Sequence, residues 1–405
     1  MTTWLSIGIL FTFAAIAFVI YRWGNVKCIG VTPVRTFTFI AILFTSGLDV
    51  GLVMFPLTEF AGYADLATSP EYSFTNPLAI EFGFWAFFIW AFYFLTCFYF
   101  CVIEPRVKFF EIPLIKFINN LVIIGTCAFT SYLLLSNLPW YLPEMGDGES
   151  VVGSFYLIVF AVIAVAVYSS TNIRFVRILS LGSSFLFLGL IALMWSGAFL
   201  SEGSSVGDFF TTFGLLGDYF ANIHKFILPI NDYHEFYLYW WFAWSIMIGQ
   251  FTARFVGGLR TYQVLIAMMV VPSLPIAVWF TVLYYYSANA IPVTGFYNMA
   301  MVLVGVTFVV NSLDSLVRLY TDNLNLTVQR FGKTKYVLGN IALLSGLTLL
   351  FKLNFLQIQW VGALAIALIL GCFGYIMATH YRQVVDIKRS PKANKIDFAK
   401  INLAN

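Results

Sequence analysis

The chain has 405 residues, of which 60% are hydrophobic and 10% charged, with a net charge of +3 and a mean hydropathy of +0.87. Soluble domains carry about 25% charged residues, so this composition excludes a soluble protein and indicates an integral membrane protein. The small positive charge suits loops that face anionic lipid, and it gives no reason to expect a nucleic-acid partner.

Eleven apolar runs approach the roughly 20 residues that a helix needs to cross a bilayer. The predicted spans are 4–21, 36–55, 80–103, 113–136, 152–170, 177–199, 233–256, 261–286, 295–318, 335–351 and 356–379. No basic stretch precedes the first run and no small-residue cleavage site follows it, so we expect a span there and not a signal peptide.

Lys and Arg residues follow the odd-numbered spans and fill the C-terminal tail, and only Lys225 and Lys352 fall on the other side. Basic loops are cytoplasmic in membrane proteins. The N-terminus is therefore expected outside and the C-terminus inside, with the basic tail against the inner membrane surface. The long outer loop, 200–232, contains the amphipathic stretch "DFFTTFGLLGDYFANI", which predicts an interfacial helix.

The sequence contains little that indicates a redox, metal or nucleotide site. The three histidines, His224, His234 and His380, lie near segment ends, which argues against a haem or a di-metal centre. The "GKT" at 332–334 lacks the glycine that opens a phosphate loop. The five cysteines fall mostly inside spans, where they are expected to pack as small apolar groups. We therefore expect a protein that is not an enzyme and holds no cofactor.

A carboxylate within the bilayer is costly and is a functional candidate by default. Asp49 lies deep in the second span between Gly47 and Gly51, and Asp314 lies near the inner end of another span. Glycines allow a helix to unwind, and freed carbonyls can then face a cation or substrate at the midplane. The alternative is a close-packing Gly-x-x-x-Gly face, which gives no reason for the carboxylate.

Two spans carry large aromatic residues at similar depth. They are Trp85, Trp90 and Tyr93 in the third span and Trp240, Trp241 and Trp244 in the seventh. At 100° per residue of helix, each set falls within an arc of about 100° to 140°. Such a cage attracts a quaternary ammonium by cation–π interaction. The alternative is ordinary core packing in a chain that is 19% aromatic.

These segments resemble those of the betaine/choline/carnitine transporter family. The stretch "YWWFAWSIMIGQFTARFVGGLRT" is similar to the family's approximate signature W-W-x-x-W-x-x-x-x-G-x-F-x-A-R-x-x-x-G-R-T. The matching residues are Trp240, Trp241, Trp244, Gly249, Phe251, Ala253, Arg254, Arg260 and Thr261. "SGLDVGLVMFPLTE", "FWAFFIWAFY" and "FVVNSLDS" resemble three further family segments, in the same order along the chain.

The resemblance implies a LeuT-like core of two inverted five-helix repeats, preceded by one extra helix and lacking the family's usual first helix. The expected divisions are 1–35, a peripheral first helix and a cytoplasmic loop; 36–199, the first repeat; 200–232, the external helix; 233–380, the second repeat; and 381–405, a short basic cytoplasmic tail.

The resemblance also implies the function: ion-coupled import of a quaternary ammonium compound by alternating access, in a bacterial inner membrane and often as a homotrimer. The six cage residues would bind choline, glycine betaine, carnitine or a related methylated zwitterion or sulfonium compound. A coupling sodium would lie near Thr45, Leu48, Asn311 and Ser312, with Asn311 in place of the family's threonine.

Asp49 replaces a family glycine, and its carboxylate could pair with a cationic substrate such as choline, bind sodium, or carry a proton. Two functions compete with ion-coupled import: exchange of substrate for product, and sensing of a ligand by a membrane protein through the same cage.

Overall fold

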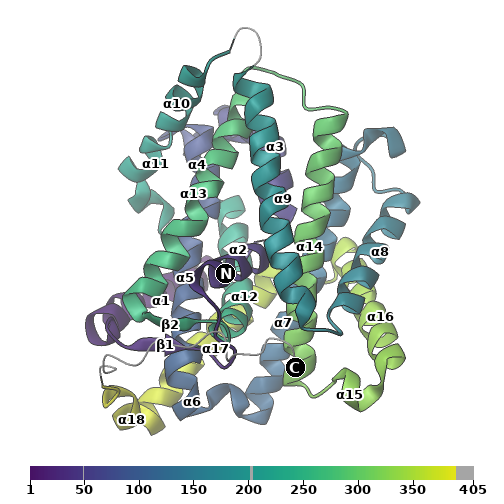
Figure 1. Cartoon of the computed structure of the whole chain (residues 1–405). Coiled ribbons are helices and arrows are strands. Elements are labelled where there is room, and N and C mark those ends of the chain that lie inside the picture. The colour runs from purple at the N-terminus through teal and green to yellow at the C-terminus, as the bar shows by residue number, and fades with distance from the viewer. Residues whose placement is uncertain (49, 201–203, 389–405) are drawn as a thin grey trace.

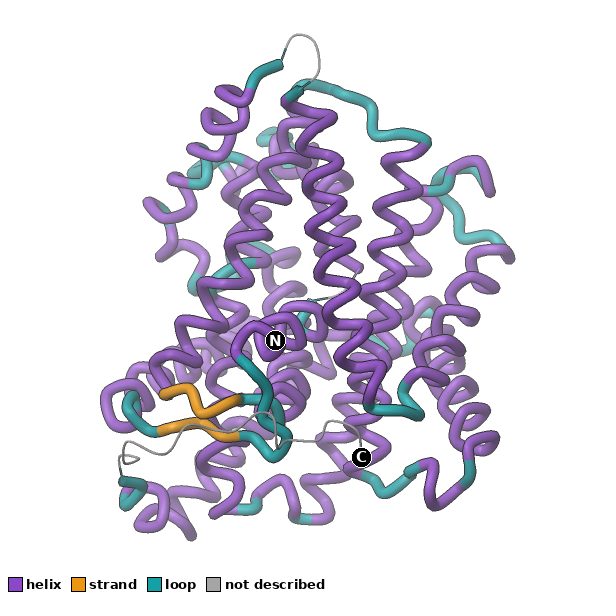
Figure 2. Tube along the Cα trace, viewed as in Figure 1, coloured by secondary structure: helices purple, strands orange, loops and turns teal. Residues whose placement is uncertain are grey.

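The computed structural model describes residues 1–48, 50–200 and 204–388, and the described chain is almost entirely helical (Figures 1 and 2). The longer helices are α1 (Thr2–Trp23), α2 (Thr36–Ser46), α3 (Val50–Ala64), α4 (Pro77–Trp85), α5 (Phe88–Phe98), α7 (Pro113–Tyr141), α8 (Gly153–Ser169), α9 (Arg174–Phe199), α10 (Val206–Gly214), α12 (Asp232–Ala253), α13 (Thr261–Ala288), α14 (Phe296–Asn323), α16 (Lys333–Lys352) and α17 (Ile358–Tyr375).

The short helical segments are α6 (Glu104–Val107), α11 (Gly217–Ala221), α15 (Val328–Phe331), α18 (Tyr381–Val385), η1 (Pro70–Tyr72), η2 (Tyr99–Ile103), η3 (Phe109–Glu111), η4 (Pro143–Met145), η5 (Ile223–Phe226) and η6 (Ile376–His380). The only strands in the described ranges are β1 (Lys27–Ile29) and β2 (Gly257–Arg260), which pair antiparallel.

Each of the eleven predicted spans coincides with a helix or a broken helix. Within the part of the chain that is described, eight helices are long and apolar enough to cross a membrane, and a ninth span results if α2 and α3 count as one. The other two positions are α8, which is apolar but has only 17 residues, and α12, whose centre is rich in Trp and Tyr. The protein is therefore an all-α membrane protein, with a count by length and composition below the eleven predicted.

Two spans are interrupted close to the predicted cage. Helices α2 and α3 meet at a bend of 53°, and Asp49 within this break lies outside the described residues. Span three breaks between α4 and α5 at Phe87, which has φ 49° and ψ −73°, and the Phe88 N–H bonds to the Ala86 carbonyl at 2.7 Å. This is a γ-turn, a rare and strained conformation for a non-glycine residue. The predicted arc of Trp85, Trp90 and Tyr93 on one continuous helix is therefore wrong.

Helix contacts in the two halves of the chain are reciprocal. Helix α7 is the third span of the first predicted repeat, and α14 is the third span of the second. Helix α7 packs on α16 and α17, and α14 packs on α8 and α9. Helix α5 packs on α12, as α13 packs on α2 and α3, and the contact of α2 with α9 matches that of α12 with α17. Two structurally related five-helix units would produce this pattern of contacts.

Glycines allow α12 to approach its neighbours at backbone distance. A Cβ on Gly249 would lie 2.0 Å from Thr96 Oγ1 and 2.7 Å from the Cys97 backbone nitrogen of α5. A Cβ on Gly362 of α17 would lie 2.2 Å from the Tyr239 carbonyl oxygen of α12. Small residues give membrane helices this close packing in the absence of a hydrophobic driving force.

We therefore expect Gly249→Ala to lower the free energy of unfolding by about 1–3 kcal/mol, the usual cost of overpacking, because α5 would have to move. Gly182→Ala on α9 is the matched control, since a Cβ there meets nothing within 4 Å. Thermal unfolding of the detergent-solubilised protein measures both. Equal midpoints for the two variants would contradict the close approach.

The outer segment differs from the single interfacial helix that was predicted. Its described residues form α10, α11 and η5, which pack on the outer parts of α4 and α13, and they bury Tyr219 and Phe226. The described part of the segment is therefore divided into short helices that cover the outer parts of α4 and α13.

Asn231, just after this segment, caps α12 through its side-chain oxygen. Its side-chain nitrogen donates to Tyr72 and to Glu71, and the hydrogen bond to Glu71 lowers the pKa of that carboxyl.

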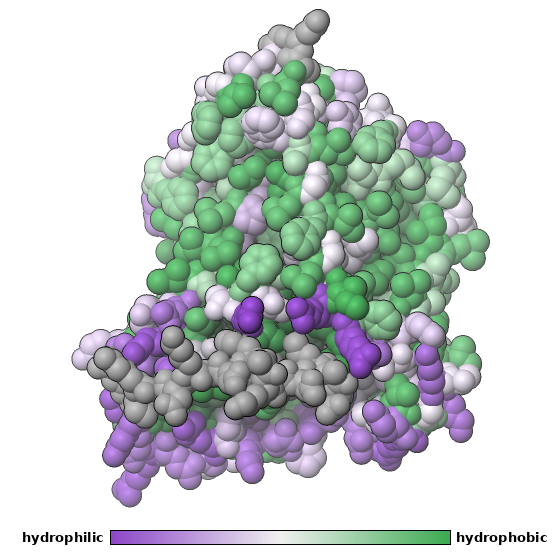
Figure 3. Space-filling model, viewed as in Figure 1, coloured by the Kyte–Doolittle hydropathy of each residue, from purple (hydrophilic) through white to green (hydrophobic). Residues whose placement is uncertain are grey.

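Hydrophobic side chains cover the middle of the molecule, and hydrophilic ones gather at the end where α6, α15 and α18 lie (Figures 1 and 3). The β1–β2 sheet lies at the same end (Figure 2). The segments that carry most of the basic residues thus meet at one end, opposite α10 (Figure 1).

Candidate functional site

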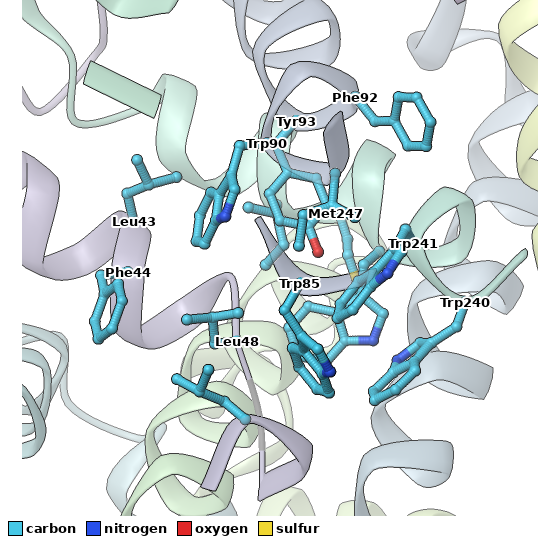
Figure 4. Packing of buried hydrophobic residues seen from close by; sticks show 14 of the residues in the cluster. Leu43, Phe44, Leu48, Trp85, Trp90, Phe92, Tyr93, Trp240, Trp241 and Met247 are labelled. Carbon is cyan, nitrogen blue, oxygen red and sulfur yellow. The ribbon is translucent and has the colours of Figure 1, made fainter. Parts of the chain in front are cut away.

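Three of the six predicted cage residues form one packed group, the tryptophan cluster of Trp85, Trp240 and Trp241 (Figure 4). Trp240 and Trp241 stack with centroids 4.6 Å apart and 12° between their planes. The Trp85 ring stands edge-on to both, at 5.4 Å from Trp240 and 4.9 Å from Trp241. Phe55 and Tyr237 contact the same rings. All three tryptophans are buried.

Trp90 and Tyr93 form a second group on α5, with ring centroids 5.4 Å apart at 79°. Trp90 lies beside Leu43 and Tyr93, separate from the tryptophan cluster in Figure 4. The Tyr93 hydroxyl donates to the Gly47 carbonyl at 3.3 Å. Trp244 is buried on α12, but in the described chain no ring contact joins it to either group.

The break in span two lies between these two groups. A Cβ on Gly47 would lie 3.1 Å from the Trp90 ring, and a Cβ on Gly51 would lie 2.6 Å from Trp85 and 3.0 Å from Trp240. The glycines on either side of position 49 thus let the backbone approach both sets of rings. The backbone on either side of position 49 therefore contacts Trp90 of one group and Trp85 and Trp240 of the other.

Four of the six aromatic side chains leave polar donors unused. The indole nitrogens of Trp85, Trp90, Trp240 and Trp244 have no hydrogen-bond partner among the described residues, whereas Trp241 donates to the Phe84 carbonyl at 2.8 Å. Buried N–H groups are normally paired. The site therefore combines π-faces, which attract a cation, with N–H donors, which can bind an anion.

Ring-to-ring distances of 4.6–5.4 Å mean that the three indoles of the tryptophan cluster fill the space between them. A ligand headgroup could enter between Trp85 and the Trp240–Trp241 stack only if these rings separated. Trp85 is the last residue of α4, immediately before the γ-turn at Phe87. A rearrangement of this turn would move Trp85 relative to α12.

The four described residues of the predicted ion site meet where the first half of span two contacts α14. Ser312 Oγ bonds to the carbonyl oxygens of Leu48 at 2.9 Å and Thr45 at 3.3 Å. Asn311 Nδ2 donates to the Thr45 carbonyl at 2.9 Å, and Ser180 Oγ donates to Asn311 Oδ1 at 3.1 Å. Asp49, the fifth predicted ligand, lies outside the described residues.

The orientation of the Asn311 amide follows from its partners. A backbone carbonyl only accepts hydrogen bonds, so the amide nitrogen must face Thr45, while a serine hydroxyl is compatible with either end of the amide. The N–H group thus points at the carbonyl that a coupling cation would use. The residues offer hard oxygen ligands of the type sodium binds, and three of these oxygens, the carbonyls of Thr45 and Leu48 and Asn311 Oδ1, already accept from protein donors.

Asp314, the second intramembrane carboxylate noted in the sequence, belongs to a buried network between α14 and α8. Its Oδ1 atom lies 3.4 Å from Arg318 Nη2 and accepts from Ser169 Oγ at 2.8 Å. Arg318 Nη2 also reaches the Ser169 carbonyl at 3.5 Å. This residue is bound to its own neighbours and is not part of the aromatic groups.

A further buried carboxylate, Glu81, was not among the residues predicted from the sequence. Glu81 is 0% exposed on α4, one helical turn before Trp85, and shares the Tyr63 hydroxyl with Glu59 of α3. Glu81 lies at the outer end of a predicted span, where a charged side chain is expected to reach water and gives no indication of a buried site. Its i, i+4 spacing from Trp85 was the available signal, because it places both side chains on one face of α4.

A cavity of about 630 Å³ lies between α1, α5 and α17, away from all predicted site residues. Its walls are apolar and include Phe11, Trp23, Ile246, Phe373 and Met377. Such a lining suits a lipid acyl chain and offers nothing to a polar substrate. The aromatic groups, and not this cavity, remain the candidate substrate site.

No family model matches the chain. It is 26% identical over 302 residues to an uncharacterized transporter of Haemophilus influenzae, an alignment that covers 64% of this chain and 44% of that protein. It is 24% identical over 327 residues to glycine betaine transporter 1 of Vibrio parahaemolyticus, an alignment that covers 69% of this chain and 60% of that protein. The chain thus spans about half the length of the curated relatives it matches.

A Na⁺-coupled sialic acid symporter in its outward-open state aligns with 94% of this chain and 82% of its own, at 14% identity and a TM-score of 0.38. That score is too low to assign a fold. The two sequence relatives are both transporters, one of them of glycine betaine, which agrees with the resemblance predicted from the motifs and with a role that is not enzymatic.

Proposed function

Because the chain is related to transporters, one of them of glycine betaine, we propose that it is a secondary active transporter that imports a quaternary ammonium compound by alternating access. The observation that carries this proposal is the tryptophan cluster packed against the break in span two. Aromatic faces supply the cation–π attraction, and a discontinuous helix is where transporters of this kind bind substrates.

The chemistry of the substrate follows from the donors around the site. A trimethylammonium group has no proton to donate and binds through its methylated surface to the indole faces. The indole N–H groups of Trp85, Trp90 and Trp244, which have no partner among the described residues, suit a carboxylate at the other end of the substrate. This combination supports a methylated zwitterion such as glycine betaine or carnitine, while Asp49 supports choline.

The coupling ion is proposed to bind among the oxygens of Thr45, Leu48, Asn311 and Ser312, together with Asp49. Sodium would have to turn the Asn311 amide, because its N–H now points at the Thr45 carbonyl. We expect Asn311→Thr to lower the sodium concentration for half-maximal uptake about two- to tenfold, since one hydrogen bond no longer has to be broken. A sodium titration of uptake measures this, with Ser184→Ala as the control on α9, and an unchanged midpoint would contradict the site.

The reciprocal helix contacts support two inverted repeats, spans two to six and seven to eleven, around this site. We also propose that the N-terminus faces outward and the basic end of the molecule faces the cytoplasm of a bacterial cell. A homotrimer is the assembly proposed from the family resemblance.

Uptake of labelled choline and glycine betaine into proteoliposomes, under separately imposed sodium and proton gradients, tests the function. Accumulation of either substrate against its gradient supports it. Uptake that occurs only against a preloaded substrate indicates an exchanger. Binding without any uptake indicates a ligand-sensing protein, and neither binding nor uptake would overturn the proposal.

A further inference from the structure

Two glutamates and three tyrosines meet on the outer side of the tryptophan cluster. The Tyr63 hydroxyl lies 2.5 Å from Glu59 Oε2 and 2.9 Å from Glu81 Oε2. Glu59 also accepts hydrogen bonds from Tyr233, through Oε1, and from Tyr237, which is 3.0 Å from both carboxylate oxygens. The residues come from α3, α4 and α12.

The two contacts of the Tyr63 hydroxyl indicate where the protons of this group lie. A hydroxyl has one proton to donate, and an ionised carboxylate only accepts. If Tyr63 donates to one carboxylate, the other can form its hydrogen bond only by donating to the tyrosine oxygen. Two separate hydrogen bonds at these distances, instead of one shared proton, therefore require one of the two glutamates to be a carboxylic acid.

The surroundings indicate that Glu81 carries this proton. Glu81 is 0% exposed, and its Oε1 atom has no hydrogen-bond partner among the described residues. An isolated buried charge is far more costly than a buried neutral acid. Glu59, in contrast, accepts from three hydroxyls, which stabilise an ionised carboxylate.

The other titratable groups near the pair make contacts elsewhere. Tyr72 packs edge-on against Tyr63, His234 of α12 stacks on Phe84 and accepts from the Ile230 N–H, and Lys225 of η5 lies over the Phe74 ring. Tyr141 of α7 donates to the Met54 carbonyl, and Tyr284 of α13 packs on Phe60. In the described chain neither glutamate forms an ion pair.

We propose that Glu59, Tyr63 and Glu81 form a proton-binding site that no substrate atom needs to enter. The proton moves in one balanced step: the Glu81 O–H bond breaks and its proton binds the Tyr63 oxygen, while the Tyr63 proton passes to Glu59 Oε2. The overall charge of the triad stays the same during this transfer, and Glu59 then releases the proton to the outer side.

The site is linked to the aromatic rings by direct contacts. Tyr237, which donates to Glu59, packs on Trp85 at 5.7 Å and on Trp240 at 5.5 Å, and Glu81 precedes Trp85 by one turn of α4. Separation of the tryptophan cluster would therefore disturb the hydrogen bonds that hold the proton. This part of the inference, that the proton is coupled to transport, rests on the proposed function.

Infrared difference spectroscopy of the purified full-length protein tests the site without transport. We expect a pH-dependent absorption band of a protonated carboxylic acid that is lost in Glu81→Gln and shifted in Tyr63→Phe. Glu149→Gln, in an outer loop, is the control that should retain the band. A band unchanged in both Glu81→Gln and Tyr63→Phe, or no such band in the native protein, would overturn the proposal. If Glu81→Gln does not fold, Tyr63→Phe, which keeps the aromatic ring, decides alone.

Uptake then tests the coupling. A proton gradient should stimulate substrate uptake by the native protein and by Glu149→Gln, and this stimulation should be lost in Glu81→Gln while substrate binding remains. Retained stimulation in Glu81→Gln would overturn the coupling. A native protein that shows the infrared band but takes up no methylated ammonium compound would refute the proposed function and leave the proton site standing.

Discussion

Replacing Trp241 with alanine is expected to weaken substrate binding about thirtyfold. Trp241 lies at the centre of the tryptophan cluster, stacked on Trp240 and edge-on to Trp85. A desolvated cation–π contact contributes roughly 2 kcal/mol, and about 1.4 kcal/mol corresponds to a tenfold change in affinity. The native Trp241 ring is also held in place by its hydrogen bond to the Phe84 carbonyl, which an alanine cannot form.

Isothermal titration of the purified protein with glycine betaine and with choline measures this loss. Trp241→Phe keeps an aromatic face and should retain more of the affinity than the alanine variant. Trp23→Ala is the matched control, because Trp23 is also buried but stacks on Phe98, away from the site. A folded Trp241→Ala variant with native affinity would show that the cluster is core packing and not a binding site.

Of the six aromatic residues that the family motifs predicted as one cage, only Trp85, Trp240 and Trp241 pack together. Trp85, Trp240 and Trp241 pack together as expected, yet Trp85 does so because span three breaks at Phe87. Nothing in "FWAFFIWAFY" marks a break, since it contains neither glycine nor proline. The break instead coincides with a tertiary contact, the hydrogen bond that the Phe87 N–H donates to Ser273 Oγ of α13.

The ion site shows a similar division between sequence and structure. The motifs predicted that Thr45, Leu48, Asn311 and Ser312 would lie together, and all four do. The direction of the Asn311 amide depends on the carbonyl that faces it across a helix interface, which no local pattern records. The direction of the amide decides whether Asn311 competes with a cation for the Thr45 carbonyl or helps to bind the cation.

Glu81 was overlooked because single-residue reasoning judges a carboxylate by its depth along a span. Near a helix end a glutamate is expected to reach water, as long charged side chains commonly do. Here α11 and η5 pack over α4 and cover its outer end. These contacts join segments that are far apart in the chain, so the burial of Glu81 cannot be predicted from the sequence around it.

Asp314 and Arg318 form a buried pair to which the sequence assigned no role. Asp314 is 0% and Arg318 9% exposed, and the pair is joined at 3.4 Å and linked to Ser169 of α8. Asp314→Ala would leave the arginine charge buried without its partner. We expect a loss of about 3–5 kcal/mol in the free energy of unfolding, as is typical when one member of a buried pair is removed.

Unfolding of the micelle-bound protein by a denaturing detergent measures this change. The matched control is Asp322→Ala. Asp322 is also on α14, and it pairs with Arg254 at the end of α12, where the Asp322 side chain is 43% exposed and that of Arg254 28%. That pair should contribute only about 0–1 kcal/mol. Equal losses for Asp314→Ala and Asp322→Ala would contradict the prediction.

The double variant Asp314→Leu with Arg318→Met separates packing from charge. Two apolar side chains should recover much of the stability, because neither leaves a buried charge unpaired. If uptake also recovers, the pair only fastens α14 to α8. If stability recovers but uptake does not, the charges act in the transport cycle, at the end of α14 opposite to the Glu59–Tyr63–Glu81 site.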